Sequence, residues 1–66
     1  MRVVTVSTRN WLLAGTVVWD QDGERWVIES VGVDRVVVQH GDRGRHELLQ
    51  RDLVTWVEDG EWKLVE

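Results

Sequence analysis

Residues 19–26 read Trp-Asp-Gln-Asp-Gly-Glu-Arg-Trp, and this stretch constrains the fold more than any other part of the chain. Asp-Gly between two alternating apolar runs is a strong signal for a β-hairpin, because glycine accepts the positive φ that tight turns require. A two-residue turn at this Asp-Gly pair would place Trp19 opposite Trp26. The neighbouring pair, Val17 and Ile28, would share their face, since side chains alternate along a strand. That face would be large, apolar and in need of cover.

The chain has 66 residues, and we expect a single domain over residues 1–66. A domain of this size is only marginally stable without disulfides, a metal or oligomerisation. It has no cysteine, so disulfides and thiolate metal sites are excluded. Stability must come from aromatic packing or self-association. Five tryptophans with no Phe and no Tyr favour aromatic packing, because each indole can bury roughly 150–250 Å².

Valine-rich runs separated by glycine-containing turns predict a fold made of short strands. The expected strands cover residues 2–7, 15–20, 24–31, 35–40, 54–58 and 61–65, with a strand or extended segment at 45–49 and a single 3₁₀ turn at 50–53. Val31 is out of phase with Trp26 and Ile28, which predicts a β-bulge near Ser30 that returns Val31 to the core.

The tripeptide Asp-Gly-Glu occurs at residues 22–24 and again at 59–61, each time followed closely by a tryptophan. The second copy predicts a second hairpin. Its register depends on the loop, so that Trp62 pairs with Val57 across a two-residue turn or with Trp56 across a three-residue loop.

Together these segments predict an all-β fold, a small five- to six-stranded antiparallel barrel. Residues 8–14 show no sustained period and are expected to form a loop whose Leu12 and Leu13 plug one end of the core. Trp11 in this loop is a candidate for partial exposure. The chain has no proline, so strand edges must be protected by charge or by closure.

Residues 13–18, Leu-Ala-Gly-Thr-Val-Val, resemble the small loop, glycine and apolar strand that open SH3-like barrels of the KOW and Tudor kind. Residues 22–28 and 35–38 resemble the meander that follows in those domains. The resemblance covers roughly residues 12–57 and implies a five-stranded, strongly bent barrel. It implies no single function, because such barrels bind RNA, DNA, peptides, methylated side chains or other subunits. The basic face of KOW domains is missing, and the Tudor aromatic cage cannot be mapped onto this chain.

The formal net charge of −4 repels nucleic acid at long range. The longest run without a charged residue, 10–19, is far shorter than the ~20 residues that span a bilayer. The first residues lack the apolar stretch of a signal peptide. We therefore expect a cytoplasmic protein that does not engage a membrane.

No residue pattern indicates catalysis, a metal or a cofactor. The only histidines, His40 and His46, are fewer than the three or four ligands of a zinc site, and both are expected to face solvent. Asp20, Asp22 and Glu24 crowd the first turn, but a hairpin tip does not exclude water as acid–base catalysis requires. We expect a protein that is not an enzyme and needs no cofactor.

The leading hypothesis is a non-catalytic interaction module that docks a protein partner, or a second copy of itself, through exposed tryptophans and a strand edge. The candidate partner-binding residues are Trp11, Trp56, Trp62, Arg43 and Arg45. The alternative is a nucleic-acid-binding accessory domain that uses the mildly basic segment 39–51. Its candidate residues are His40, Arg43, Arg45, His46 and Arg51. A structural subunit of a larger particle is a third possibility.

Overall fold

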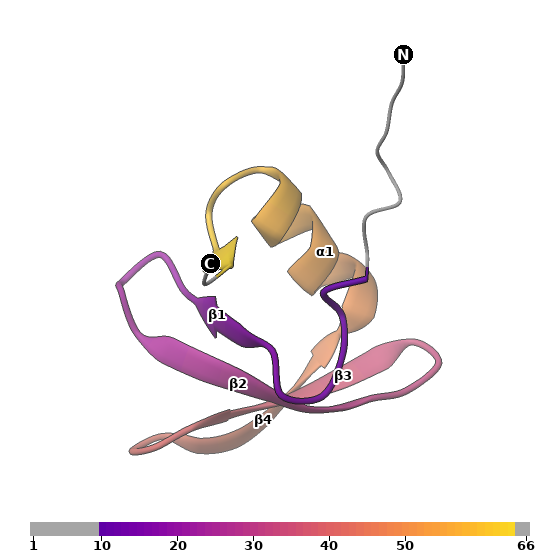
Figure 1. Ribbon diagram of the computed structural model, residues 1–66, viewed down its shortest axis with the longest axis horizontal. Helices are drawn as coiled ribbons and strands as arrows, with labels where there is room; N and C mark the ends of the chain where they lie inside the picture. The colour runs from indigo at the N-terminus through magenta and orange to yellow at the C-terminus, as the bar shows by residue number, and fades with distance from the viewer. Residues whose placement is uncertain (1–9, 65–66) are drawn as a thin grey trace.

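A computed structural model describes residues 10–64, so the strand expected at 2–7 lies outside the described residues. The elements in chain order are β1 (Val17–Trp19), β2 (Arg25–Val31), β3 (Arg35–His40), β4 (Gly44–Leu49), α1 (Gln50–Glu58) and β5 (Lys63–Leu64), as Figure 1 shows. The strands form one antiparallel sheet in the order β4-β3-β2-β1-β5. The expectation of a mostly β, antiparallel fold is confirmed.

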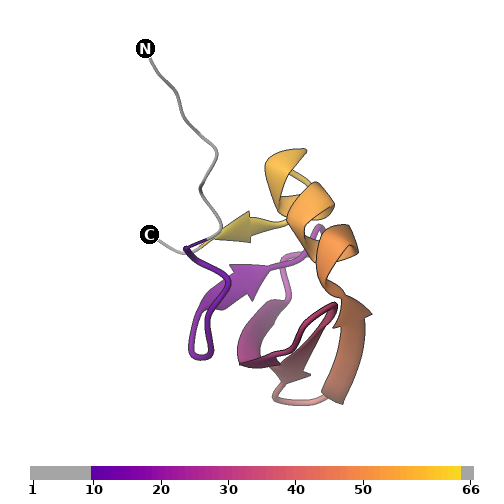
Figure 2. The same cartoon turned by 90° about the vertical axis from the view of Figure 1, so that its right-hand side faces the viewer.

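The sheet does not close into a barrel within the part of the chain that is described. β4 and β5 are its two edges, and no ladder joins them. Helix α1 leaves the end of β4, lies over one face of the twisted sheet and returns the chain to β5 beside β1 (Figures 1 and 2). The barrel prediction is therefore wrong for residues 10–64, where a helix covers the face that strand closure was expected to cover.

Helix α1 replaces both the 3₁₀ turn and the second hairpin that the sequence predicts, so those two predictions are wrong. Leu53, Val54 and Val57 lie on one helical face, and the first two are buried. The spacing i, i+1, i+4 is helical and buries a stripe, whereas a strand would divide these residues between two faces.

The second Asp-Gly pair ends the helix instead of turning a hairpin. Gly60 adopts a φ of 83°, and its N–H donates to the carbonyl of Val57 at 3.1 Å. The N–H of Glu61 donates to the carbonyl of Trp56 at 2.9 Å. These two bonds form a Schellman motif, in which a left-handed residue after the helix satisfies its last carbonyls.

The first Asp-Gly pair does turn a hairpin, but through three loop residues instead of two. Val18 pairs with Trp26, and Trp19 pairs with Arg25. The shift of one position moves Trp19 to the face opposite Trp26, since side chains alternate. Trp19 is accordingly 37% exposed, whereas Trp26 is 6% exposed. The predicted pairing of Trp19 with Trp26, and the apolar face built on it, are wrong.

The register between β2 and β3 shifts between Ile28 and Ser30, which confirms the predicted bulge. Its predicted consequence is wrong, because Val31 remains 37% exposed. The bulge instead keeps Ile28 opposite Val38, where both side chains are buried. A bulge also bends its strand, and this helps the sheet curve around one core.

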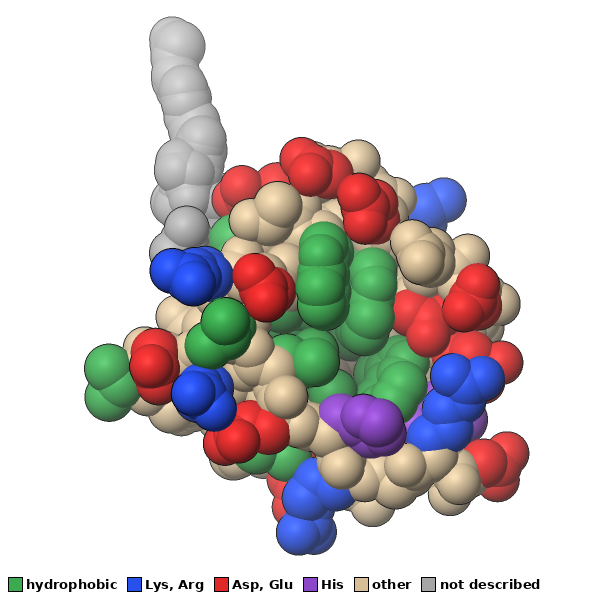
Figure 3. All heavy atoms as spheres, turned by 180° about the vertical axis from the view of Figure 1, so that it is seen from behind, with side chains coloured by type: hydrophobic (Ala, Val, Ile, Leu, Met, Phe, Trp, Pro, Cys, Tyr) green, Lys and Arg blue, Asp and Glu red, His purple; other side chains and the backbone are tan. Residues whose placement is uncertain are grey.

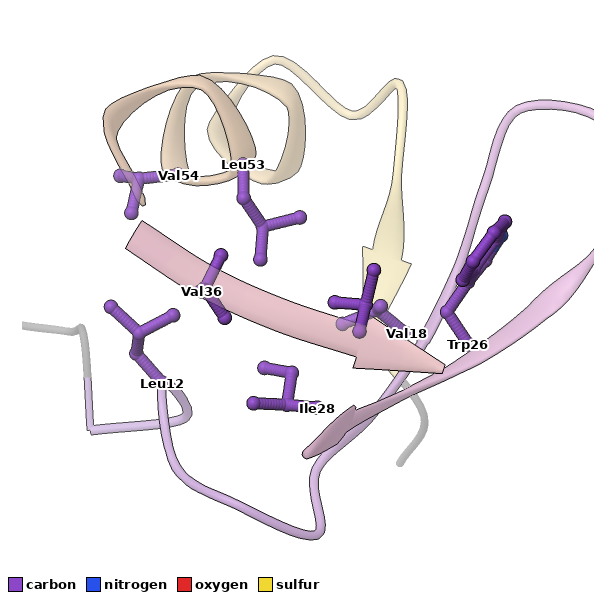
Figure 4. Packing of buried hydrophobic residues seen from close by; sticks show 8 residues of the cluster. Leu12, Val18, Trp26, Ile28, Val36, Leu53 and Val54 are labelled. Atoms are coloured by element: carbon purple, nitrogen blue, oxygen red, sulfur yellow. The ribbon is translucent and has the colours of Figure 1, made fainter. Parts of the chain in front are cut away.

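The core lies between α1 and the sheet (Figure 4), and eight apolar side chains form it. These are Leu12, Val18, Trp26, Ile28, Val36, Val38, Leu53 and Val54. The loop prediction is half right, since Leu12 is buried and Leu13 is 60% exposed. Within residues 10–64 no helix has the length and apolar character needed to cross a membrane.

The substitution Leu53→Ala is expected to lower the free energy of unfolding by about 2–5 kcal/mol, because it leaves a cavity between α1 and the sheet. Urea unfolding followed by tryptophan fluorescence measures the loss. Val33→Ala is the control, since Val33 is 99% exposed and the change should stay within about 0.5 kcal/mol. Equal effects of the two substitutions would contradict the packing described above.

Candidate functional site

Trp26, His46, Trp56 and Trp62 lie in contact along one side of the molecule, and we call these four side chains the aromatic row. The buried ring of His40 also contacts Trp26, with centroids 5.0 Å apart. The rings of Trp56 and Trp62 stack with centroids 5.3 Å apart and planes 28° apart. Trp62 also stacks on Trp26, at 6.3 Å and 27°. His46 meets Trp26 edge to face at 5.1 Å and 84°. These separations lie in the range that aromatic pairs favour.

The way helix α1 ends brings Trp56 and Trp62 together. The carbonyl of Trp56 accepts the N–H of Glu61 at 2.9 Å and that of Trp62 at 3.1 Å. The chain therefore reverses immediately after the helix, and the reversal brings one indole back over the other. The positive φ of Gly60 makes this tight reversal possible without the steric penalty that a side chain would carry.

A carboxylate in the first hairpin turn fixes the third indole. Asp20 Oδ2 accepts the N–H of the Trp26 indole at 3.0 Å. Its other oxygen, Oδ1, accepts the backbone N–H of Asp22 at 2.8 Å and that of Glu24 at 2.9 Å. One side chain thus holds both the shape of the loop and the orientation of the ring.

These bonds also set the charge state of Asp20. Partial burial raises its pKa, but the hydrogen bonds from Trp26, Glu24 and Asp22, with the nearby charge of Arg43, lower it by more. The net effect is a pKa below the ordinary value of 3.8, because the donors favour the ionised form.

His40, the residue before the β3–β4 loop, shapes its loop as Asp20 shapes the first one. Its Nδ1 accepts the backbone N–H of Asp42 at 3.0 Å and that of Arg43 at 3.1 Å. A nitrogen that accepts carries no proton, so in the neutral ring Nε2 does, and it donates to Glu24 Oε1 at 2.6 Å. His40 is 8% exposed, so the prediction that it faces solvent is wrong.

The aromatic row is open to solvent along part of its length. Figure 3 shows apolar side chains gathered in a hollow, with acidic groups above and beside them and His and basic side chains below. Trp56 and Trp62 are half-buried, His46 is exposed and Trp26 is buried beneath them. The prediction that His46 faces solvent is confirmed, although its ring also contacts Trp26.

The five predicted partner-binding residues lie in three places. Trp56 and Trp62 are together in the aromatic row. Trp11 is half-buried against the core in the loop before β1 and is in no ring contact with the described tryptophans. Arg43 is exposed at the β3–β4 turn, whereas Arg45 pairs with Glu29 at 2.8 Å.

The alternative, nucleic-acid-binding set is spread in the same way. His40 is enclosed between two loops, and Arg45 is already paired with an acid. Arg51 lies in the first turn of α1, beside a hollow of about 300 Å³ that Val33 and Asp34 also line. The histidines and arginines of segment 39–51 therefore do not form one continuous basic surface.

Trp26 and Asp20 were not among the predicted site residues, and Trp19 was predicted on the wrong face of the sheet. Trp19 was expected to cover the core, but the three-residue loop turns it outward. The signal for that loop is Asp20 itself, because an Asp at this point of a turn accepts backbone N–H groups two and four residues on.

No protein family, curated protein or solved structure matches this chain. Among residues 10–64, no three His, Asp or Glu side chains lie close enough together to hold a metal ion. Among the described residues, the aromatic row is the candidate functional site.

The substitution Asp20→Asn is expected to destabilise the fold by about 1–2 kcal/mol near pH 7, because the amide nitrogen cannot accept the indole N–H of Trp26. The wild-type advantage is complete above the unfolded-state pKa of about 3.9 and disappears as pH falls through the lower folded-state pKa. Urea unfolding between neutral pH and about pH 2 measures both effects.

The matched control is Asp22→Asn, which removes the same charge from the same loop, where the Asp22 carboxylate bonds to no described residue. Its effect should stay within about 0.5 kcal/mol at every pH. If both variants behave alike, Asp20 does not have the role assigned to it.

Proposed function

We propose that this protein is a non-catalytic interaction module that docks a protein partner on the aromatic row. The observation that carries the proposal is the stack of Trp56 and Trp62 on Trp26, part of which is left open to solvent. Tryptophan is the residue most enriched at the energetic centres of protein interfaces, where a partner completes the burial of the ring.

The rigidity of the row supports the same proposal. Trp62 is stacked between two indoles, and the Trp26 ring is fixed by the carboxylate of Asp20. Side chains that are already ordered lose little conformational entropy on binding, so more of the contact energy contributes to affinity.

A strand edge lies next to the row and extends the proposed surface. β5 follows Trp62 directly and pairs only with β1 among the described strands. Its outer backbone groups can accept an extended segment by strand addition, with main-chain hydrogen bonds on one side and the indoles beside them.

The relation to SH3-like domains of the KOW and Tudor kind stays a proposal. What supports it is the bent antiparallel meander of β2, β3 and β4 and the bulge in β2. The nucleic-acid alternative has weaker support, because His40 is enclosed and Arg45 is paired. We place the binding activity on the tryptophans for this reason.

Selection from a random peptide library displayed on phage tests the proposal, with the purified protein as bait. We expect enriched peptides whose affinity falls at least about tenfold on Trp62→Ala, since truncation of a central interface Trp costs on the order of 2 kcal/mol or more. Val33→Ala is the control, because this fully exposed side chain lies outside both the row and the hollow beside it, and its loss should change affinity less than about twofold.

Chemical-shift mapping on the unmodified protein gives a second readout that does not depend on how well a variant folds. Binding should shift the indole N–H resonances of Trp56 and Trp62 more than that of Trp11, which packs against the core outside the row. Enriched peptides that bind with no dependence on Trp62 and shift other parts of the molecule would refute the proposed docking surface.

A further inference from the structure

We infer that the partner segment bound on the aromatic row is basic, an inference that rests on the proposed function and adds the chemistry of the ligand. Lys or Arg side chains of an extended peptide would lay their aliphatic stems along the indoles and reach acidic groups at the borders of the row. Three observations carry this inference: the distribution of unpaired acids, the hollow between two loops and the spacing of the rings.

The charges of the molecule are distributed unevenly between its two sides. The arginines of β3 and β4 are matched with acids, since Arg35 lies 3.4 Å from Glu47 and Arg45 lies 2.8 Å from Glu29. These pairs neutralise that part of the sheet, so it presents little net field to a charged partner.

The border of the aromatic row formed by the segment after α1 is acidic, whereas His and basic side chains lie along the opposite border (Figure 3). Asp59 and Glu61 lie on either side of Gly60 in the segment that leads to Trp62, and both are exposed. Neither forms an ion pair with a cation in the described part of the chain, and the same holds for Asp22 at the first hairpin turn. The acids beside the row are therefore available to a cation supplied from outside.

The two acidic loops also line an open hollow of about 570 Å³ beside the row, together with Trp19 and with none of the row's tryptophans. Asp20 lines it from the β1–β2 turn and Glu61 from the segment between α1 and β5, with Lys63 as the one cation in the lining. Acids on two sides of one concavity reinforce each other's potential, which attracts cations and repels both phosphate groups and a second acidic copy of this chain.

The distances between neighbouring rings are close to the side-chain repeat of an extended peptide. The centroid separations along the row are 5.3 and 6.3 Å. Side chains on one face of an extended peptide recur about every 6.6 Å, at about 3.3 Å per residue. Trp56 and Trp62 are the indoles of the row that are open to solvent, so two successive same-face residues of a bound segment can meet them, while the borders of the row are left to charged groups.

Three synthetic peptides of about nine residues test the inference, with the shared pattern Ala-X-Leu-X-Ala-X-Leu-X-Ala and X as Lys, Gln or Glu. Fluorescence anisotropy with the same label on each peptide gives affinities at about 20 mM and about 300 mM salt. We expect the Lys peptide to bind at least about tenfold tighter than the Gln peptide at low salt, and this ratio to fall below about threefold at high salt.

The double substitution Asp59→Asn/Glu61→Gln should weaken the Lys peptide about five- to tenfold at low salt, because both exposed acids border the row. Asp34→Asn/Asp52→Asn is the matched control. It removes the same charge from the turn before β3 and the first turn of α1, and should change affinity less than about twofold.

Equal binding of the Lys and Gln peptides, or equal effects of the two double substitutions, would overturn the inference about charge. Tighter binding of a single-stranded oligonucleotide than of the Lys peptide would overturn it as well. If selected peptides depend on Trp62 but are not basic, the docking surface stands and only the ligand chemistry is wrong. If no peptide depends on Trp62, both proposals fail.

Discussion

The hydrogen bond from the Trp26 indole to Asp20 is the interaction on which the rest of the structure depends. It allows a large side chain to be buried against Val18 in the core while its one polar atom is satisfied, which a buried indole requires. The same carboxylate shapes the first loop, and Glu24 from that loop bonds to His40 at the second. Both hairpin tips are thus linked around one ring.

The two hairpin loops are held by the same kind of hydrogen bond, accepted by different side chains. In each, the residue before a three-residue loop accepts two backbone N–H groups, through a carboxylate oxygen at Asp20 and through a ring nitrogen at His40. A glycine with positive φ closes each turn: Gly23 is the last residue of the first loop, and Gly44 is the first residue after the second. The atoms that shape each loop, Asp20 Oδ1 and His40 Nδ1, accept from backbone N–H groups, so these bonds do not depend on the side chains of the residues that donate.

Much of the sheet could be predicted from the sequence, and the limits of that prediction have physical causes. β3 falls where a valine run predicts it, and the bulge in β2 falls where the apolar phase breaks. The predicted pairing of Trp19 was wrong by one position, because the length of the first loop depends on the hydrogen bonds that Asp20 accepts. Those bonds form only in the folded loop.

The second Asp-Gly pair shows why local sequence alone was insufficient at the site. Gly23 and Gly60 have nearly the same φ, 82° and 83°, yet one turns a hairpin and the other ends a helix. The difference lies in the preceding residues, where Leu53, Val54 and Val57 have helical spacing. Trp56 and Trp62 could be identified as candidates from composition, but their stacking on Trp26 required the tertiary fold.

The stacking of Trp62 on Trp26 joins parts of the chain that are far apart in sequence. Such a surface is absent from the unfolded ensemble, so a ligand that recognises it binds only the native state. By mass action, saturation with that ligand would raise the apparent stability of the domain. Its small core provides only a small free energy of unfolding without the ligand. Occupancy of the surface and persistence of the fold are therefore thermodynamically linked.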